Sequence, residues 1–258
     1  MAIDDQNLEI RLARTEEDML GAQRLRYRVF VEELSGDGAL VDHERRLERD
    51  RYDPFYDHLI LVDRRRDATA LDHVVGVYRL LPGDRAPAAG GFYCAGEYDL
   101  TPLERSGRRL LELGRSCVHP DFRGGAALFH LWNGLGDYVL ERDIELLFGV
   151  ASFHGTDVAA LAQPLSYLHH HHLAPPDLRV RALDEAFTPM DILPEDAVDR
   201  VRAVREIPQL IKSYLRLGGF VGEGAFVDRP FNTTDICLVM DMERISQTQR
   251  ARYTGGRG

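Results

Sequence analysis

The segment from residue 110 to residue 153 constrains the fold more than any other part of this sequence. It predicts a strand over Leu110–Val118, a glycine-containing turn, an amphipathic helix that runs to about Arg142, and a second strand over Leu146–Phe153. Apolar residues recur at helical spacing along the middle part and define one face, at Leu128, Leu131, Trp132, Leu135 and Val139. The segment therefore predicts a strand–helix–strand unit.

Patterns elsewhere add a hairpin and further helices. A capping box at Thr15–Asp18 predicts the start of a helix over 17–33, and apolar runs at 58–62 and 73–81 predict two strands joined by a polar turn. The later part of the chain predicts a helix over 156–170, strands over 178–185, 219–227 and 235–242, and helical structure around 195–217. A hairpin followed by a strand–helix–strand unit favours an α/β fold with a mixed central sheet flanked by helices.

Composition is that of an ordinary globular protein, with 44% hydrophobic and 29% charged residues in a chain of 258. Because no linker or repeat interrupts it, we expect a single domain over 1–258, with a core at about 8–155 and a C-terminal elaboration at about 156–245. The sequence contains no apolar stretch of about 18 residues, no signal peptide pattern at its acidic start and no CxxC pair among three cysteines. We therefore expect a cytoplasmic protein without a disulfide framework.

The distribution of charge excludes one class of partner and favours another. A formal net charge of −10 argues against a dedicated nucleic-acid binder. The basic residues are arginines apart from Lys212, and they cluster at 45–51, 64–66 and 105–109. Such clusters are typical of solvated surface charge, and they also suit an acidic partner protein or anionic lipid headgroups.

The turn before the predicted central helix has the composition of an anion-binding site. It consists of Arg123, Gly124, Gly125, Ala126 and Ala127. Small residues let a ligand approach the backbone, and the free N–H groups of a helix start, with an arginine beside them, attract a phosphate. A Gly-Gly pair at a helix start is also ordinary turn chemistry, and the sequence matches neither the Walker nor the dinucleotide pattern.

The predicted strand before this turn carries an acid within an apolar run. Glu112 shares one face with Gly114 and Ser116, while Arg115 points to the other face unless a bulge intervenes. A buried acid is costly without a role, so Glu112 is a candidate general base for deprotonating an amine. The alternative is a structural ion pair with Arg79 or Arg115.

A third group of candidates surrounds Arg26, which lies between apolar helix residues and therefore needs carboxylate partners. The acids that follow in the sequence are Glu48, Asp50, Asp53 and Asp57. They either lock the first helix onto the sheet or bind substrate, and the two roles are compatible. His58 opens a strand and is a further polar candidate. The four histidines at 169–172 point in different directions on a helix, so we expect no metal site there.

Together these features resemble a known pattern. The strings LRYRVFVEEL, ERDRYD, YRLLP and ELGR, in this order, are similar to the core of the acyl-homoserine-lactone synthases, which are enzymes of the GNAT fold. The chain more closely resembles the ornithine N-acyltransferase family, on the strings YDPFYDHL, VGVYRLL, ELGRSCVHPDFRGG, LFHLWNGL and IPQLIKSYLRLGGFVGEGAFVDRPFNTTDICLV. The resemblance spans about residues 20–240 and implies a GNAT, or acyl-CoA N-acyltransferase-like, fold with a C-terminal extension.

The resemblance also implies roles for individual residues. Glu112 is the implied general base, with Arg115 and Ser116 beside it in the catalytic strand. The acceptor-binding residues that the resemblance implies are Arg26, Phe30, Asp50, Asp53 and Arg79. The sequence itself adds Asp57 and His58 as candidates for the same role. The implied phosphopantetheine-binding residues are Val118, Arg123, Gly124, Gly125, Ala126 and Ala127, and a bulge in the strand would present N–H groups to the thioester carbonyl.

The activity implied by the resemblance is transfer of a 3-hydroxyacyl group from acyl carrier protein to the α-amine of L-ornithine, without a metal or cofactor. The product, lyso-ornithine lipid, makes contact with a membrane surface a further expectation. One departure is Leu34-Ser35-Gly36, where the lactone synthases carry a tryptophan. The alternatives are glutamine, glycine or another amino acid as acceptor, a lactone synthase using S-adenosylmethionine, and a non-catalytic acyl-carrier or lipid-binding protein.

Overall fold

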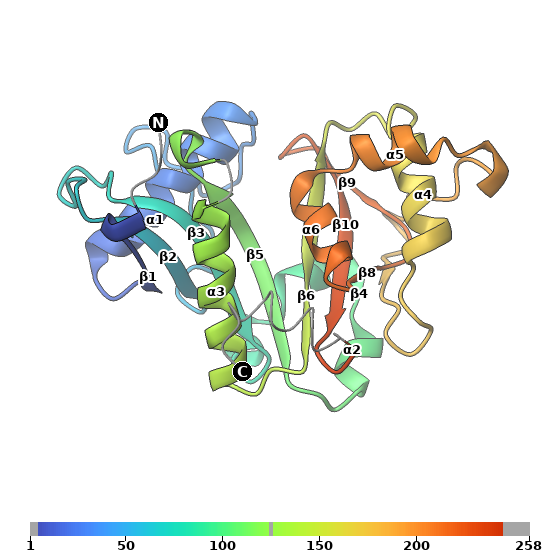
Figure 1. Ribbon diagram of the computed structural model, residues 1–258, viewed down its shortest axis with the longest axis horizontal. Coiled ribbons are helices and arrows are strands. Elements are labelled where there is room, and N and C mark those ends of the chain that lie inside the picture. The colour runs from blue at the N-terminus through green and yellow to red at the C-terminus, as the bar shows by residue number, and fades with distance from the viewer. Residues whose placement is uncertain (1–4, 124–125, 245–258) are drawn as a thin grey trace. The chain divides into compact units, whose positions relative to one another are not determined.

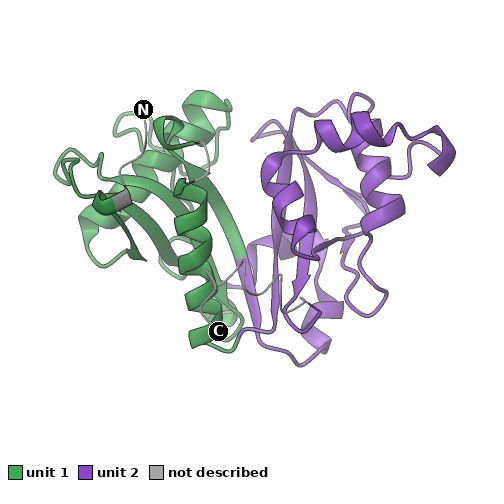
Figure 2. Cartoon of the chain, viewed as in Figure 1, with its two compact units in different colours: residues 1–89, 113–143, 250–258 green, residues 90–112, 144–249 purple. Residues whose placement is uncertain are grey.

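A computed structural model describes residues 5–123 and 126–244 of the chain. Within these residues the chain forms two units (Figure 2). The first unit contains residues up to 89 together with 113–143, and the second contains 90–112 together with 144–244. The chain therefore passes between the units at 89/90, 112/113 and 143/144, and the middle one of these crossings lies inside a strand.

The sheet of the first unit is built on an antiparallel hairpin (Figure 1). Strands β2 (Asp57–Asp63) and β3 (Val74–Pro82) form the hairpin that the apolar runs predict. Strand β1 (Leu8–Leu12), which we did not predict, pairs antiparallel with the outer side of β2. The end of β5 (Leu110–Val118) follows β3 in the strand order.

Helices cover both faces of this sheet. Because side chains alternate along a strand, Ile60 and Val62 of β2 join the apolar cluster under α1 (Glu16–Arg26). Leu59 and Leu61 lie on the opposite face, against α3 (Ala126–Glu141). A Cβ added to Gly134 of α3 would meet Leu59, and a Cβ added to Gly76 of β3 would meet Leu61. This alternation explains why β2 and β3 are apolar on both faces.

The capping box predicted at Thr15 is confirmed. The Thr15 hydroxyl accepts the Asp18 backbone N–H at 3.1 Å, and the Asp18 carboxylate accepts the Thr15 N–H at 3.3 Å. Asp18 also binds Arg11 of β1 at 2.6 Å, which ties the start of the helix to the edge strand. The predicted helix over 17–33 has the expected extent, but its last part, η2 (Tyr27–Glu33), is π-helical.

The second unit supplies the parallel pairing. Residues 110–112 of β5 pair parallel with β6 (Leu146–His154), and β6 pairs antiparallel with β10 (Thr233–Asp241). The short strands β8 (Phe220–Val221) and β9 (Phe226–Asp228) pair antiparallel with β10. The predicted fold class, an α/β fold with a mixed central sheet flanked by helices, is confirmed.

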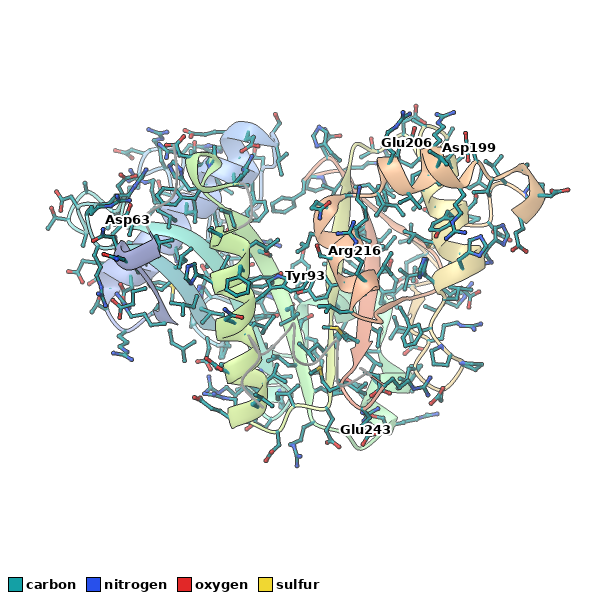
Figure 3. The ribbon with its side chains drawn as sticks, viewed as in Figure 1. Asp63, Tyr93, Asp199, Glu206, Arg216 and Glu243 are labelled. Atoms are coloured by element: carbon teal, nitrogen blue, oxygen red, sulfur yellow. The ribbon has the colours of Figure 1, made fainter. Side chains whose placement is uncertain are left out.

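Helices α4 (Ala162–His172), α5 (Arg200–Glu206) and α6 (Gln209–Arg216) belong to the second unit. Asp199 caps α5 by accepting two backbone N–H groups at 3.0 Å, and Asp199 and Glu206 mark its ends in Figure 3. On α6, the Lys212 ammonium lies 3.4 Å from a backbone carbonyl of Arg205. None of the helices in the described residues is long and apolar enough to cross a membrane.

The later part of the chain is more irregular than its pattern predicts. The expected strand at 178–185 shrinks to β7 (Arg181–Ala182), which pairs with β4 (Tyr98–Asp99). The predicted helical stretch at 195–217 is interrupted at Pro208, because proline has no backbone N–H to donate to the preceding helical turn. The short elements that complete the chain are η1 (Asp5–Asn7), η3 (Ala86–Ala89), η4 (Tyr93–Gly96), α2 (Thr101–Arg105), η5 (Pro120–Phe122) and η6 (Glu195–Ala197).

Candidate active site

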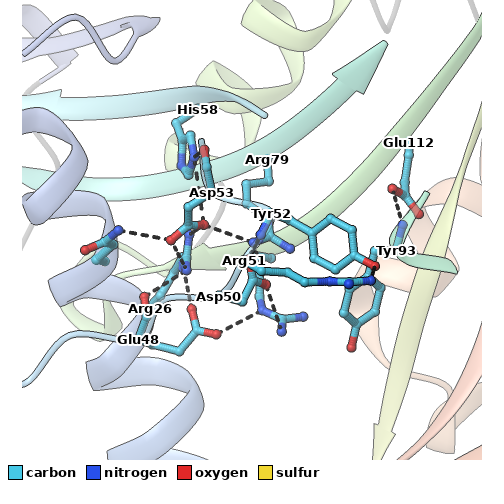
Figure 4. Close-up of polar contacts among 12 residues, drawn as sticks. Arg26, Glu48, Asp50, Arg51, Tyr52, Asp53, His58, Arg79, Tyr93 and Glu112 are labelled. Carbon is cyan, nitrogen blue, oxygen red and sulfur yellow. Dashed lines mark hydrogen bonds and ion pairs between the residues drawn. The ribbon is translucent and has the colours of Figure 1, made fainter. Parts of the chain in front are cut away.

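The arginine that ends α1 lies in a cluster of charged side chains in the first unit (Figure 4). Arg26 is fully buried, and its guanidinium donates to both carboxylate oxygens of Asp53, at 2.7 and 3.0 Å. It also contacts the Glu48 carboxylate and donates to the Glu48 backbone carbonyl at 2.8 Å. A buried arginine is stable only when its charge and donors are met in this way. The contacts therefore fasten α1 to the loop that precedes β2.

Two further arginines join this group from neighbouring strands. Arg79 of β3 donates to Asp50 at 2.7 Å and to Asp53 at 3.0 Å, and it stacks over the Tyr56 ring at 4.5 Å. Arg115 of β5 donates to Glu48 at 3.1 Å. Three guanidinium groups thus face three carboxylates. We call this set the arginine–carboxylate cluster: Arg26, Glu48, Asp50, Asp53, Arg79 and Arg115.

The electrostatics of the cluster keep its acids ionised. Burial by itself raises the pKa of Glu48, Asp50 and Asp53, but the surrounding arginines lower it more, so the pKa of each lies below its ordinary value. The titratable neighbour His58 stays neutral at pH 7. Its burial, and then the nearby charge of Arg26, lower its pKa to about 4. The His58 Nε2 lies 3.2 Å from the Asp53 backbone carbonyl.

Strand β5 changes conformation where it joins the cluster. Arg115 has a φ of 48°, in the left-handed region, and such a residue inside a strand marks a bulge. The Arg115 guanidinium faces Glu48 and lies 6.0 Å from the Phe30 ring. Beside it, a Cβ added to Gly114 would lie 3.9 Å from the Arg79 guanidinium, so the glycine leaves that side of Arg79 uncovered.

The predicted residue Asp57 does not belong to the cluster. Its carboxylate accepts the Tyr138 hydroxyl at 2.7 Å and the Arg85 guanidinium at 2.8 Å. Burial, and then the hydrogen bond to Asp57, raise the pKa of the Tyr138 phenol, which therefore donates. The structure thus places Asp57 at a contact between β2 and the end of α3.

Glu112 lies in the second unit, three residues before Arg115 on the same strand. Its side chain is buried, and one carboxylate oxygen accepts the backbone N–H of Tyr93 at 2.9 Å (Figure 4). The other oxygen accepts the backbone N–H of Cys94 at 2.7 Å. These donors belong to the first turn of η4. They hold the carboxylate in one orientation, as a positioned acid–base group requires.

Cys94 is a partner of Glu112 that we did not predict. Burial raises the pKa of its thiol well above the ordinary value, and hydrogen bonds with Cys237 and Glu112 add to this effect. The thiol is therefore protonated and available as a donor beside the carboxylate. A sequence pattern gives little hint of this contact, since 18 residues separate Cys94 from Glu112. The one local sign is the pair Gly90 and Gly91, both with positive φ, which turns the chain back toward the strand.

The candidate donor-binding residues lie at the end of β5 and the start of α3. Arg123 donates to the Glu33 carboxylate at 2.7 Å and to the Val118 carbonyl at 3.2 Å, so its guanidinium is engaged in an ion pair here. Ser116 is partly exposed, and Ala126 and Ala127 form the first turn of α3. Gly124 and Gly125 lie outside the described residues.

Three carboxyl groups of the second unit form the only set within the described residues that meets the geometry for a metal ion. Glu97, Asp228 and Asp235 are buried, with ligand oxygens within 4.8 Å of one another. Buried acidic groups also occur without an ion, so we assign no metal to them. The histidines of α4 do not converge: His170 faces the Leu193 carbonyl at 2.8 Å, and His171 packs against Tyr167.

Comparison with known proteins identifies the family. Residues 25–133 match the acetyltransferase (GNAT) domain family. An L-ornithine N(alpha)-acyltransferase from Rhodobacter capsulatus is 63% identical over 98% of this chain and 97% of its own. The protein of the same name from Brucella abortus is 41% identical over 96% of this chain and 89% of its own. The chain belongs to the L-ornithine N(alpha)-acyltransferase family.

Membership in the L-ornithine N(alpha)-acyltransferase family makes this chain an acyltransferase and confirms the resemblance drawn from its motifs. The fold agrees as well. The solved structure of an N-acyl amino acid synthase from uncultured soil microbes matches 92% of this chain and 93% of its own at a TM-score of 0.53, with 11% identity. The roles of single residues remain predictions that rest on the geometry described above.

Proposed function

We propose that this enzyme transfers a 3-hydroxyacyl group from the thioester of acyl carrier protein to the α-amine of L-ornithine, forming lyso-ornithine lipid. The observation that carries the proposal is 63% identity, over nearly the full length of both chains, to a protein named for acylation of ornithine at this amine. The carrier protein as donor, and the lipid as product, rest on the motif resemblance. No metal or cofactor takes part in the proposed reaction.

In the proposed mechanism Glu112 is the general base. Its carboxylate, held by the Tyr93 and Cys94 N–H groups, removes a proton from the α-ammonium of ornithine directly or through a water. The free amine then attacks the thioester carbonyl carbon, the C–S bond breaks, and the thiolate takes up a proton. Backbone N–H groups released by the bulge at Arg115 would stabilise the oxyanion.

The arginine–carboxylate cluster suggests how the acceptor is held. The N–H groups of Arg26 donate hydrogen bonds to Glu48 and Asp53. In contrast, the Nε–H of Arg79 is buried and has no hydrogen-bond partner among the described residues. Arg79 is therefore the better candidate for the α-carboxylate of ornithine. Of the three acids, Asp50 has the most exposed side chain, at 19%, and is the candidate for the δ-ammonium.

The direct test uses the purified enzyme with a 3-hydroxyacyl carrier protein and a panel of amino acids. Thiol release and the product mass are measured with ornithine, lysine, glutamine and glycine. We expect turnover to be highest with ornithine. A preference for another amino acid would show that ornithine is not the acceptor. Formation of a lactone from S-adenosylmethionine would show that the enzyme is a lactone synthase. Carrier binding without thiol release would show that the protein is not catalytic.

A cellular test addresses the product and its location. Lipids of a host that expresses this chain should contain a species with the mass of 3-hydroxyacyl ornithine, and a host with the empty vector should not. Because this product is a single-chain amphiphile, we further propose that the enzyme works in the cytoplasm and releases the product at the inner membrane surface. Recovery of the protein with anionic vesicles measures that contact.

A further inference from the structure

A small pocket of the first unit lies beside helix α1, away from the arginine–carboxylate cluster. Arg24, Arg28, Arg46, Leu71, Asp72 and His119 line it. Its volume is about 60 Å³. Pockets that enclose a whole small molecule usually measure at least about 300 Å³, so this one admits only the tip of a side chain or a similarly small group.

Two of the three arginines that line this pocket, Arg24 and Arg28, have no acidic partner among the described residues. Within residues 5–123 and 126–244, no carboxylate lies within 4.0 Å of Arg24 or Arg28. In contrast, Arg46 pairs with Glu32, and the lining acid Asp72 is neutralised by Arg66 at 2.8 Å. The pocket therefore holds two guanidinium groups that form no ion pair with the described part of the chain.

The guanidinium groups of these two arginines make some contacts within the chain and leave at least one N–H donor without a partner in the described residues. The Arg24 Nε is buried without a hydrogen-bond partner in the described part of the chain, while its Nη2 donates to the Arg45 carbonyl at 2.8 Å. The Arg28 guanidinium contacts Nε2 of His119. Burial, followed by the charges of Arg28 and Arg66, lowers the pKa of His119, so the ring is neutral and does not offset the Arg28 charge. Its Nδ1 accepts the Asp121 backbone N–H at 3.2 Å. A guanidinium that has no ion-pair partner can form strong, charge-assisted hydrogen bonds with a carboxylate.

We propose that this pocket receives carboxylate side chains of the acyl carrier protein and so docks the donor substrate. The inference rests on the proposed function, which names that donor. Acyl carrier proteins are acidic, whereas this chain itself carries a net charge of −10, so overall attraction cannot bring the two together. Arg24 and Arg28, which form no ion pair within the described chain, supply a local attraction. The small volume of the pocket admits the carboxylate end of a side chain.

The place of the pocket in the chain fits such a role. His119 directly follows β5, and Arg123 begins the turn proposed to hold the phosphopantetheine phosphate four residues later. Docking at the pocket would deliver the prosthetic arm to the end of the strand that carries Glu112 and Arg115. Charged groups at the rim of an interface mainly set the association rate and its dependence on salt.

The test compares two donors with the same acyl group. One is the acyl carrier protein thioester, and the other is the acyl-phosphopantetheine thioester, which keeps the phosphate and lacks only the protein. For Arg28→Gln and for Arg24→Gln, we expect the ratio of kcat/KM for the carrier-bound donor to that for the protein-free donor to fall about three- to tenfold, with the loss shrinking at high salt. Because Arg28 contacts His119, Arg24→Gln serves as the second variant if Arg28→Gln does not fold.

The matched control is Arg64→Gln, which removes the same charge from the same unit. Arg64 has a 60% exposed side chain and pairs with Glu9 at 3.0 Å, so its replacement should leave the donor ratio as in the wild type. An equal fall in the control would show that only overall charge matters, and would overturn the inference. Equal losses with both donors would overturn it as well, because the pocket would then hold a group that both donors share.

Two further outcomes distinguish docking of the carrier protein from binding of lipid and from failure of the activity itself. If the variants keep the wild-type donor ratio but lose binding to vesicles of phosphatidylglycerol and phosphatidylethanolamine, the pocket binds lipid headgroups and the docking inference is wrong. If the wild-type enzyme shows no turnover with any carrier-bound donor, the proposed function fails instead. Wild-type turnover from the carrier with unchanged ratios in both variants would contradict docking alone.

Discussion

At the scale of single residues, the enzyme stabilises its buried carboxylates in two different ways, by ion pairs with arginines and by hydrogen bonds from backbone N–H groups. Arg26, Glu48 and Asp53 meet each other's charge, so the pKa values of the acids fall and the group is held ionised. Glu112 is held differently, by two backbone N–H groups. Backbone N–H groups fix the orientation of a carboxylate without an ion pair to them, whereas a carboxylate in a bidentate ion pair is committed to its arginine. This contrast favours Glu112 over the cluster acids as the base.

The first prediction concerns Glu112. In Glu112→Gln the amide cannot accept a proton from the ammonium, so kcat for acyl transfer should fall by about 100-fold or more. The matched control is Glu145→Gln, because Glu145 is also a carboxylate that accepts a backbone N–H, that of Arg109 at 2.9 Å. Steady-state rates and thermal melting of both variants are compared. Full turnover in a folded Glu112→Gln protein would rule out the assignment.

The second prediction concerns the neutral histidine beside the cluster. The pKa of His58 is about 4 in the folded protein and 6.5 in a free side chain, so the unfolded chain binds a proton first as the pH falls. The free energy of unfolding should therefore decline from about pH 6.5 to pH 4, by about 3 kcal/mol for this group, and change no further from His58 below that range.

Urea unfolding as a function of pH measures this dependence. His58→Gln should be less sensitive than the wild type to pH between 6.5 and 4, and the difference isolates His58 from His119 and His172, whose pKa values burial also lowers. A His43→Gln control, at a 56% exposed side chain, should follow the wild-type curve. Identical slopes for His58→Gln and the wild type would contradict the assigned cause.

At the scale of elements, the packing of α3 on the sheet depends on the absence of a side chain. A Cβ on Gly134 would lie 2.5 Å from Cγ1 of Ile10 and 3.3 Å from Leu59. We therefore expect Gly134→Ala to lower the free energy of unfolding by about 1–3 kcal/mol, because the helix must move away from β1 and β2. Gly96→Ala is the control, since a Cβ there meets nothing within 4 Å. Comparable melting temperatures for the two variants would show that α3 adjusts without cost.

Elements whose causes are local were predictable from the sequence. The capping box at Thr15 and the apolar strand at 110–118 both have the predicted positions, because each depends on neighbours within a few residues. The family motifs then indicated the members of the arginine–carboxylate cluster, though Glu48 appeared only as a nearby acid. Features that depend on distant partners were missed: strand β1, which exists through pairing with β2, and the Tyr93–Cys94 turn that holds Glu112.

At the scale of the whole molecule, neither unit is a continuous piece of chain. Residues 90–112 complete the second unit, because Phe92 packs against Phe148 at 4.9 Å and the Tyr98 hydroxyl donates to the Gly224 and Asp235 carbonyls at 3.0 Å. Residues 110–112 also form the parallel edge on β6. From the sequence we expected a single domain with a core at about 8–155 and a C-terminal elaboration at about 156–245, and this expectation stays a prediction.

This interleaving predicts how fragments behave. A fragment of residues 144–258 lacks the segment that covers β6 and β10, so it should show little cooperative melting by circular dichroism. A fragment of residues 90–258 contains the whole second unit, and it should melt with a cooperative transition. Similar cooperative transitions in both fragments would mean that residues 90–112 are dispensable for the second unit.

The lysine on α6 has a practical and a chemical consequence. Lys212 is the one lysine among 32 basic residues, and guanidinium groups do not react with amine-directed acylating reagents at neutral pH. A succinimidyl dye will therefore label a single side chain, on a helix of the second unit, and report on that unit without touching the arginines. If the donor is the thioester proposed above, the same scarcity leaves it almost no side-chain amine of this chain to acylate.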